Sequence, residues 1–323
     1  MKRRNLIAAA VAAPLVAATR RANAAERLVG WISPESRETT APFFKALQDG
    51  LAANLPRGAE PIRLIERYDA VGAEPVAAQV AELERLGVRL IVSQGAATVP
   101  VVNAKRSVPV VFGYSGDPVV AGIAPSLARP GGSATGMSFM SLELTPKRID
   151  LVRAARPDCR KVALLSNARH PGEEREIAAC QAAVERLGIE LSVHRVSGAT
   201  ELRPVLAQAL DGGAQAVVML TSSFMVLHAP VVADACRARK VPLISGWASI
   251  ARSGALLTYG PNLEACYKRV AFYVVRVLAG AAPDSLPIEQ PSVLELAINT
   301  GTAAALGLAL PPYLLAQADE VIE

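Results

Sequence analysis

Short apolar, β-branched segments alternate with helix-like stretches along most of the chain, and this alternation limits the possible folds more than any other feature. Apolar runs of four to eight residues are typical of strands buried in a parallel sheet, and the stretches between them have helical periodicity. Strands are expected at residues 28–33, 62–68, 90–94 and 108–114, with helices at 41–55, 75–86 and 96–105. A second series follows, with strands at 162–167, 191–196, 216–220 and 242–246 and helices at 173–187, 201–210 and 225–239.

Each series is a βαβ array, which predicts a doubly wound parallel sheet covered by helices on both faces. The fold class is therefore α/β with two Rossmann-like lobes joined by a multi-segment hinge. The breaker cluster at 128–133 lies between the series, and the next helix is expected to open at Thr145-Pro146. We expect lobes at 25–144 and 145–258, with 259–290 returning to the first lobe and 291–323 joining the second. Three crossings would make a hinge whose segments bend together.

The first 24 residues have the organisation of a signal peptide. Lys2, Arg3 and Arg4 precede an apolar run over 6–18, and small residues end at Ala24, so cleavage is expected before Ala25. The apolar run is shorter than the roughly 20 residues that cross a bilayer. We therefore expect a periplasmic, soluble mature chain, exported by the Sec or the twin-arginine route. No cysteine lies near the cleavage point, so no lipid anchor and no membrane insertion of the mature chain are expected.

The basic charge of the chain belongs to this leader. Residues 1–24 hold five Lys and Arg and no Asp or Glu, so the formal net charge of +5 falls to zero without them. No basic surface is left to indicate nucleic acid or anionic lipid as a partner.

Neither a metal site nor a cofactor is expected, and no catalytic residue is assigned. The three histidines lack metal-ligand spacing, and the chain has no G-x-S-x-G, P-loop or G-x-G-x-x-G motif. Export permits disulfides, but the four cysteines show no C-x-x-C spacing and also suit apolar helix faces, so their pairing stays open: Cys159, Cys180, Cys236 and Cys266.

Candidate ligand contacts follow from the rule that ligands of open parallel sheets bind beyond the carboxyl ends of the strands. These positions carry hydroxyls, amides, glycines and aromatic rings, which hydrogen-bond to and stack on a small solute, and no nucleophile–base pair is evident among them. In the first series they are Ser33, Gln94, Gly95, Thr98, Tyr114, Ser115 and Asp117. In the second they are Asn167, Thr221, Ser222, Ser223 and Trp247.

Some of these residues also suit structural roles. Asp117 precedes Pro118, an arrangement typical of a cap. Thr98 and Ser115 could satisfy loop backbone groups, and Tyr114 could pack at the lobe boundary. Trp247, at a strand end, is expected to line the cleft, whereas Trp31, inside a strand, is expected in the core. The acidic stretch 35–38 is interpreted as a solvated loop.

Four segments carry a resemblance to a known family: VPVVFGYSGDPV at 108–119, SLARPGGSATG at 126–136, LPIEQP at 286–291 and the closing run at 294–322. Over essentially the whole mature chain, the sequence resembles the type I periplasmic-binding-protein superfamily. Within it, the sequence is similar to the ABC-transporter substrate-binding proteins that include tryptophan- and other aromatic-amino-acid-binding members. The resemblance implies a two-lobed clamp that closes on its ligand, with an ABC permease and ATPase as partners.

Carried over by position, the resemblance places residues 114–117, 221–223 and 246–247 at cleft-facing strand ends. The turn after Gly95 is one residue shorter than is usual in the family, so Ala96, Ala97 and Thr98 all stay candidates for facing the ligand. Amino-acid-binding relatives tend to have an acidic residue at 221–223 and at 246–247, where this chain has none. Asp117 is left as the candidate partner for a ligand ammonium group.

The sequence thus predicts a monomeric, extracytoplasmic solute-binding protein of an ABC importer, for a small organic solute that is aromatic or amino-acid-like. In this hypothesis the first lobe binds through Gln94, Thr98, Tyr114 and Asp117, and the second lobe then closes over the ligand. Two alternatives stay open. One is a sensor whose bound form is read by a membrane receptor, and the other is a two-domain α/β hydrolase or transferase.

Overall fold

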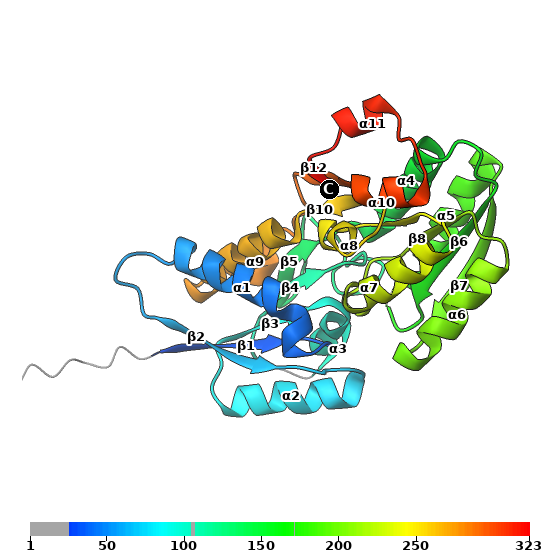
Figure 1. The fold of residues 1–323 in the computed structure, drawn as a ribbon. Helices are drawn as coiled ribbons and strands as arrows, with labels where there is room; N and C mark the ends of the chain where they lie inside the picture. Colours follow the sequence, from blue (N-terminus) through cyan, green and yellow to red (C-terminus); the bar gives the residue numbers. More distant parts are fainter. Residues whose placement is uncertain (1–25, 105–106, 171) are drawn as a thin grey trace, which may run out of the picture.

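The computed structural model describes residues 26–104, 107–170 and 172–323, and the predicted signal peptide lies outside them. Two α/β lobes lie side by side, each with its own sheet (Figure 1). This confirms the predicted fold class.

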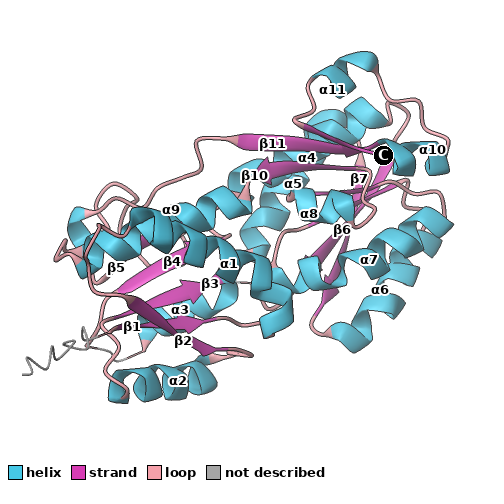
Figure 2. Cartoon of the chain, turned by 60° about the vertical axis from the view of Figure 1, so that its left-hand side comes forward, coloured by secondary structure: helices cyan, strands magenta, loops and turns pink. Residues whose placement is uncertain are grey.

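The first sheet is wholly parallel, in the order β2-β1-β3-β4-β5. Helices α1 and α9 pack on one face, and α2 and α3 pack on the other (Figure 2). The strands are β1 (Arg27–Ile32), β2 (Ile62–Arg67), β3 (Leu90–Gln94), β4 (Val110–Tyr114) and β5 (Ala134–Ser138). The helices are α1 (Arg37–Asn54), α2 (Ala73–Arg85), the 3₁₀ turn η1 (Gly95–Ala97), α3 (Thr98–Asn103) and α9 (Leu263–Leu278).

The second sheet has the order β12-β11-β10-β9-β8-β6-β7 and is parallel except between β10 and β11. Its strands are β6 (Lys161–Asn167), β7 (Glu190–Val196), β8 (Ala216–Met219), β9 (Leu243–Ser245), β10 (Leu257–Pro261), β11 (Leu294–Asn299) and β12 (Glu320–Ile322). Its helices are α4 (Ser141–Ala155), α5 (Glu173–Leu187), α6 (Ala199–Asp211), α7 (Ser223–Ala238), α8 (Ala248–Arg252), α10 (Thr300–Leu306) and α11 (Pro312–Ala316). Helices α4 and α5 share one apolar cluster, and α6, α7 and α8 share another.

The chain passes between the two sheets at three places: between β5 and α4, between β10 and α9, and before β11. The last return runs through η2 (Pro283–Ser285) and then beside β5. There Thr135 Oγ1 donates to the Leu286 carbonyl at 2.8 Å, and the Ser138 amide donates to the Glu289 carbonyl at 2.9 Å. These bonds hold the segment that leads into β11 against the first sheet.

Two helices begin four residues earlier than the sequence indicated. Helix α4 begins at Ser141 instead of Thr145, and α1 begins at Arg37 because the Ser36 hydroxyl accepts a hydrogen bond from the Thr39 amide. Pro42 and Pro146 therefore lie inside helices instead of marking their starts. The acidic stretch 35–38 is accordingly not a solvated loop throughout, since Glu38 is in the first turn of α1.

Trp31 is in the core, as expected. Its side chain is buried between Phe44 and Tyr267, with ring centroids 5.4 and 6.0 Å away. No helix in the described part of the chain is long and apolar enough to cross a membrane.

All four cysteines are free and buried. Burial raises the pKa of the Cys180, Cys236 and Cys266 thiols to about 12, which suppresses the reactive thiolate. We therefore expect Ellman's reagent to label almost no thiol in the folded protein and four thiols in 6 M guanidinium chloride. Fewer than four after unfolding without reductant would show that a disulfide forms.

Candidate ligand-binding site

The carboxyl ends of β1, β3 and β4 face those of β6, β8 and β9, and the predicted contact residues gather along this boundary. Most of them are buried: Ser33, Gln94, Gly95, Thr98, Tyr114, Ser115, Thr221, Ser222, Ser223 and Trp247. Asn167 and Asp117 are partly exposed. Burial of so many polar side chains requires that they find partners, and the partners define the site.

Gln94 joins the two lobes directly. The Ser33 hydroxyl donates to Gln94 Oε1 at 3.1 Å, and Gln94 Nε2 donates to the Ser223 hydroxyl at 2.8 Å. Gly95 permits this approach, because its φ is +55° and a Cβ there would lie 3.2 Å from Ser223 Oγ. The amide of the first lobe thus reaches the start of α7 in the second.

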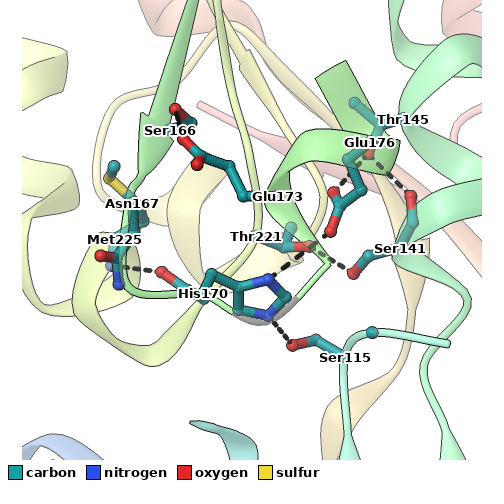
Figure 3. Close-up of polar contacts among 12 residues, drawn as sticks. Ser115, Ser141, Thr145, Ser166, Asn167, His170, Glu173, Glu176, Thr221 and Met225 are labelled. Carbon is teal, nitrogen blue, oxygen red and sulfur yellow. Dashed lines mark hydrogen bonds and ion pairs between the residues drawn. The ribbon is translucent and has the colours of Figure 1, made fainter. Parts of the chain in front are cut away.

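A second contact between the lobes involves His170, which the sequence showed only as an isolated histidine. Ser115 Oγ lies 2.7 Å from His170 Nε2 (Figure 3). The imidazole also stacks on the Tyr114 ring, with centroids 6.4 Å apart. Burial lowers the pKa of His170 to about 4, so the ring is neutral at pH 7. The two partners are 55 positions apart in the sequence, which explains why their sequence positions gave no signal.

Ser115 and His170 bring a hydroxyl beside an imidazole, a pairing that the strand-end residues do not form among themselves. The pair nevertheless lacks the third member of a hydrolytic triad. Glu176 Oε1 is 3.7 Å from His170 Nδ1, which is beyond hydrogen-bond distance, so the carboxylate does not hold the imidazole in one tautomer. The arrangement is suited to holding two lobes together more than to acyl transfer.

Behind His170 lies a buried ionic network of the second lobe. Arg148 is fully buried; its Nε donates to the Tyr259 carbonyl at 2.9 Å and its Nη1 donates to Thr145 Oγ1 at 2.8 Å. Thr145 Oγ1 in turn lies 3.2 Å from Glu176 Oε2. Burial raises the pKa of Glu176 to about 7, although the nearby Arg148 guanidinium by itself lowers it. Glu176 therefore titrates near neutral pH inside the molecule.

Arg148 Nη2 has no hydrogen-bond partner among the described residues. It lies against Gly246, where a Cβ would come within 2.4 Å of it, and against Gly260, where the corresponding distance is 3.3 Å. Glycine at the ends of β9 and β10 is thus required for the guanidinium to fit at the cleft edge of the second sheet.

Several predicted contacts have a structural partner. Asp117 Oδ1 accepts from the amides of Val119 and Val120 at 2.8 and 3.2 Å, so it caps the following turn. Ser222 Oγ accepts from the Met225 amide and caps α7. Thr221 Oγ1 lies 2.7 Å from the Ser141 hydroxyl within the second lobe.

Two cavities lie beside these contacts. The larger, of about 730 Å³, is lined by Asn167 and by residues next to the Gln94–Ser223 contact, such as Ala96 and Phe224. The smaller, of about 160 Å³, is lined by Trp247 together with Phe43 of α1. Trp247 is 5% exposed, and its Nε1 has no hydrogen-bond partner in the described part of the chain. Most of the predicted contact residues therefore lie either at the Gln94–Ser223 and Ser115–His170 contacts between the lobes or in the two cavities beside them.

Two α/β lobes, joined by three segments and meeting at the carboxyl ends of their strands, define a type I periplasmic binding fold. Comparison with known proteins gives the family: residues 35–322 match the ABC transporter substrate binding proteins, and the chain belongs to that family.

A tyrosine-binding protein of Clostridioides difficile (strain R20291) is 24% identical over 207 residues, which is 64% of this chain and 59% of the relative. The match thus spans less than two thirds of that protein's length.

Solved structures share the fold. An ABC domain from Streptococcus pneumoniae in complex with L-Trp has a TM-score of 0.84 at 20% identity, covering 92% of this chain and 100% of that one. A conserved domain protein from Vibrio cholerae has a TM-score of 0.83 at 20% identity, covering 91% and 99%. The ligand-free, open form of a Clostridium difficile substrate binding protein with adhesive properties has a TM-score of 0.67 at 17% identity, covering 92% and 99%.

Proposed function

We propose that this chain is the periplasmic solute-binding protein of an ABC importer, and that it captures an aromatic amino acid or a similar small solute by closing its lobes. The observation that carries the proposal is the pair of contacts across the cleft, Gln94 to Ser223 and Ser115 to His170. Each joins side chains from different lobes, so an opening of the hinge would break both and expose their polar groups to a ligand.

The comparisons support this proposal in two ways. The relatives include a tyrosine-binding protein and a domain in complex with L-Trp. The chain also superposes better on that L-Trp complex, with a TM-score of 0.84, than on the ligand-free, open structure, with 0.67. The first observation favours an aromatic amino acid as the ligand, and the second is expected of a closed clamp. Membership of the family makes a permease and an ATPase the expected partners, and the sequence of residues 1–24 favours export.

Native mass spectrometry of the gently purified protein tests the proposal first, since a tightly held solute would be carried along. A thermal-shift panel of aromatic amino acids, aromatic carboxylates and sugars follows. We expect an aromatic amino acid to raise the melting temperature with rising concentration, because a ligand at 100 times its Kd stabilises the folded state by about 2.7 kcal/mol. Absence of any stabiliser, together with turnover of an ester or amide through Ser115 and His170, would reject the binding function.

Closure itself can be followed by fluorescence, because Trp31 and Trp247 are the two tryptophans of the chain. Trp247 lines the smaller interlobe cavity, whereas Trp31 lies in the core of the first lobe. We expect ligand to shift the emission of the wild type and of Trp31→Phe to shorter wavelength, since closure removes water from Trp247. Trp247→Phe should show no such shift. A shift that persists in Trp247→Phe and vanishes in Trp31→Phe would contradict the expected motion.

A further inference from the structure

The cavity of about 730 Å³ has walls from both lobes, and its lining includes charged side chains that take no part in the Gln94–Ser223 and Ser115–His170 contacts. The loops after β1 and β2 and the start of α3 form its first-lobe wall, and the loops after β6 and β7 with the start of α7 form its second-lobe wall. Its volume is within the range of about 300–1,000 Å³ that is typical of small-molecule sites.

The first-lobe wall carries two carboxylates, Glu35 and Asp69. The loops that bear them run together, because the Asp69 amide donates to the Glu35 carbonyl at 3.3 Å and the Ala70 amide donates to the Ser33 carbonyl at 3.0 Å. No side-chain hydrogen bond or ion pair engages either carboxylate within the described residues. Burial and the nearby Asp69 raise the pKa of Glu35 to about 7. A cation placed between the two acids would therefore reduce the repulsion between their carboxylates and favour the charged form of Glu35.

The second-lobe wall has the opposite character. Arg169 lines it, and within the described residues its guanidinium makes no ion pair, while its amide donates to Asn167 Oδ1 at 3.0 Å. The N-terminus of α6 lies beside it, where the N-cap is Gly198 and no side chain caps the helix. Glu201 binds the Ser197 amide at 2.8 Å, and the amide of Ala199 has no acceptor in the described part of the chain. A carboxylate would find both a charge and a free amide here.

Apolar side chains complete the lining. Phe224 and Val99 face the cavity from α7 and α3 and belong to the edges of two different hydrophobic clusters. A ligand with separate cationic and anionic groups and an apolar remainder matches all three parts of this lining.

We propose that this cavity binds an α-amino acid, with Glu35 and Asp69 holding its ammonium group, Arg169 and the start of α6 holding its carboxylate, and Phe224 and Val99 contacting its apolar side chain. The inference rests on the proposed function and replaces Asp117, which caps a turn, as the expected partner of the ammonium group. Because the two charges of the ligand pair with different lobes, its binding favours the closed arrangement.

The test is calorimetric titration of the full chain with L-tryptophan, L-tyrosine and L-phenylalanine. Glu35→Gln and Arg169→Gln should each weaken binding of the amino acid that the wild type binds by tenfold or more. Matched controls are Glu38→Gln, three residues away in the first turn of α1, and Arg175→Gln, an exposed position of α5; both should stay within twofold of the wild type.

Analogues separate the two subsites. Glu35→Gln should change the affinity for 3-indolepropionate or 3-phenylpropionate, which lack the ammonium group, by less than twofold. Arg169→Gln should do the same for tryptamine or phenethylamine, which lack the carboxylate. Thermal melts check folding, and Glu35→Gln should melt no lower than the wild type because it removes a partly buried charge that Asp69 repels.

The outcomes distinguish failure of the proposed function from failure of the cavity assignment. If the wild type binds none of the three amino acids at millimolar concentration, an amino-acid-binding function is rejected, and the cavity assignment with it. If the wild type binds one of them and Glu35→Gln and Arg169→Gln bind it equally well, the assignment of this cavity is overturned while the proposed function stands.

Discussion

Arg148→Leu is expected to destabilise the protein by about 3 kcal/mol at pH 8, because the buried Glu176 carboxylate would be left without the nearby guanidinium charge that compensates it. The Tyr259 carbonyl and Thr145 Oγ1 would lose their donor, and the Glu176 carboxylate would lose the guanidinium that favours its charged form. At pH 5.5 the loss should be smaller, since Glu176, whose pKa is about 7 in the wild type, is then protonated with or without Arg148. Urea unfolding followed by circular dichroism at both pH values measures this.

Arg153→Leu is the matched control, five residues further along α4. Its guanidinium is partly buried and donates to the Pro157 and Leu187 carbonyls at 2.8 and 2.5 Å, without a buried acidic partner. Its loss should cost about 1 kcal/mol at either pH, as is usual for a single hydrogen-bonding side chain. A loss for Arg148→Leu no greater than that of the control, or equal at both pH values, would show that the network has no ionic role.

His170→Gln is expected to change how stability depends on pH. The folded-state pKa of His170 is about 4 against an ordinary 6.5, so between these values the unfolded chain binds a proton that the folded chain does not. The contribution of the neutral ring is therefore present above pH 6.5 and is lost as the pH falls toward 4. Between pH 7 and pH 4.5 the wild type should lose about 2 kcal/mol more than the variant.

The Glu176 carboxylate beside the ring has the opposite effect on how stability depends on pH, but this effect is common to the wild type and the variant. The raised pKa of Glu176 makes the folded state gain stability as the pH falls from about 7 toward 4.5. This gain occurs in the wild type and in His170→Gln, so the difference between their unfolding free energies isolates His170. His194→Gln is the control, because His194 is only half-buried, and burial and the nearby Lys161 lower its pKa. A wild-type loss equal to that of His170→Gln would mean that His170 titrates normally.

Much of the fold was predictable, because strands and helices follow from local patterns. The predicted strand at 90–94 coincides with β3, and the predicted helix at 173–187 coincides with α5. Helix starts near proline were less accurate, since Ser36 caps α1 and Pro42 is accommodated one turn inside it. A proline restricts the residues around it without saying on which side the helix begins.

The candidate site was predictable only in part. The strand-end rule led to Gln94, Ser115 and Ser223, which meet or contact the other lobe. It passed over His170, which lies beyond the end of β6 in the loop before α5, and Glu35, which its neighbours Glu38 and Arg37 made look like part of a solvated surface. Whether these residues face a partner depends on loop geometry that no spacing encodes.

By itself, the sequence determined the class of fold, the order of its elements and the set of polar residues at the strand ends, because hydrophobic periodicity and chain breaks act over a few neighbouring residues. Only the tertiary structure decided which of those residues meet. The contact of Gln94 with Ser223 spans 129 positions, and the contact of Ser115 with His170 spans 55. Such contacts depend on how the two sheets are placed against each other, and so do the burial that shifts the pKa values of Glu176 and His170 and the opposing charges of the large cavity.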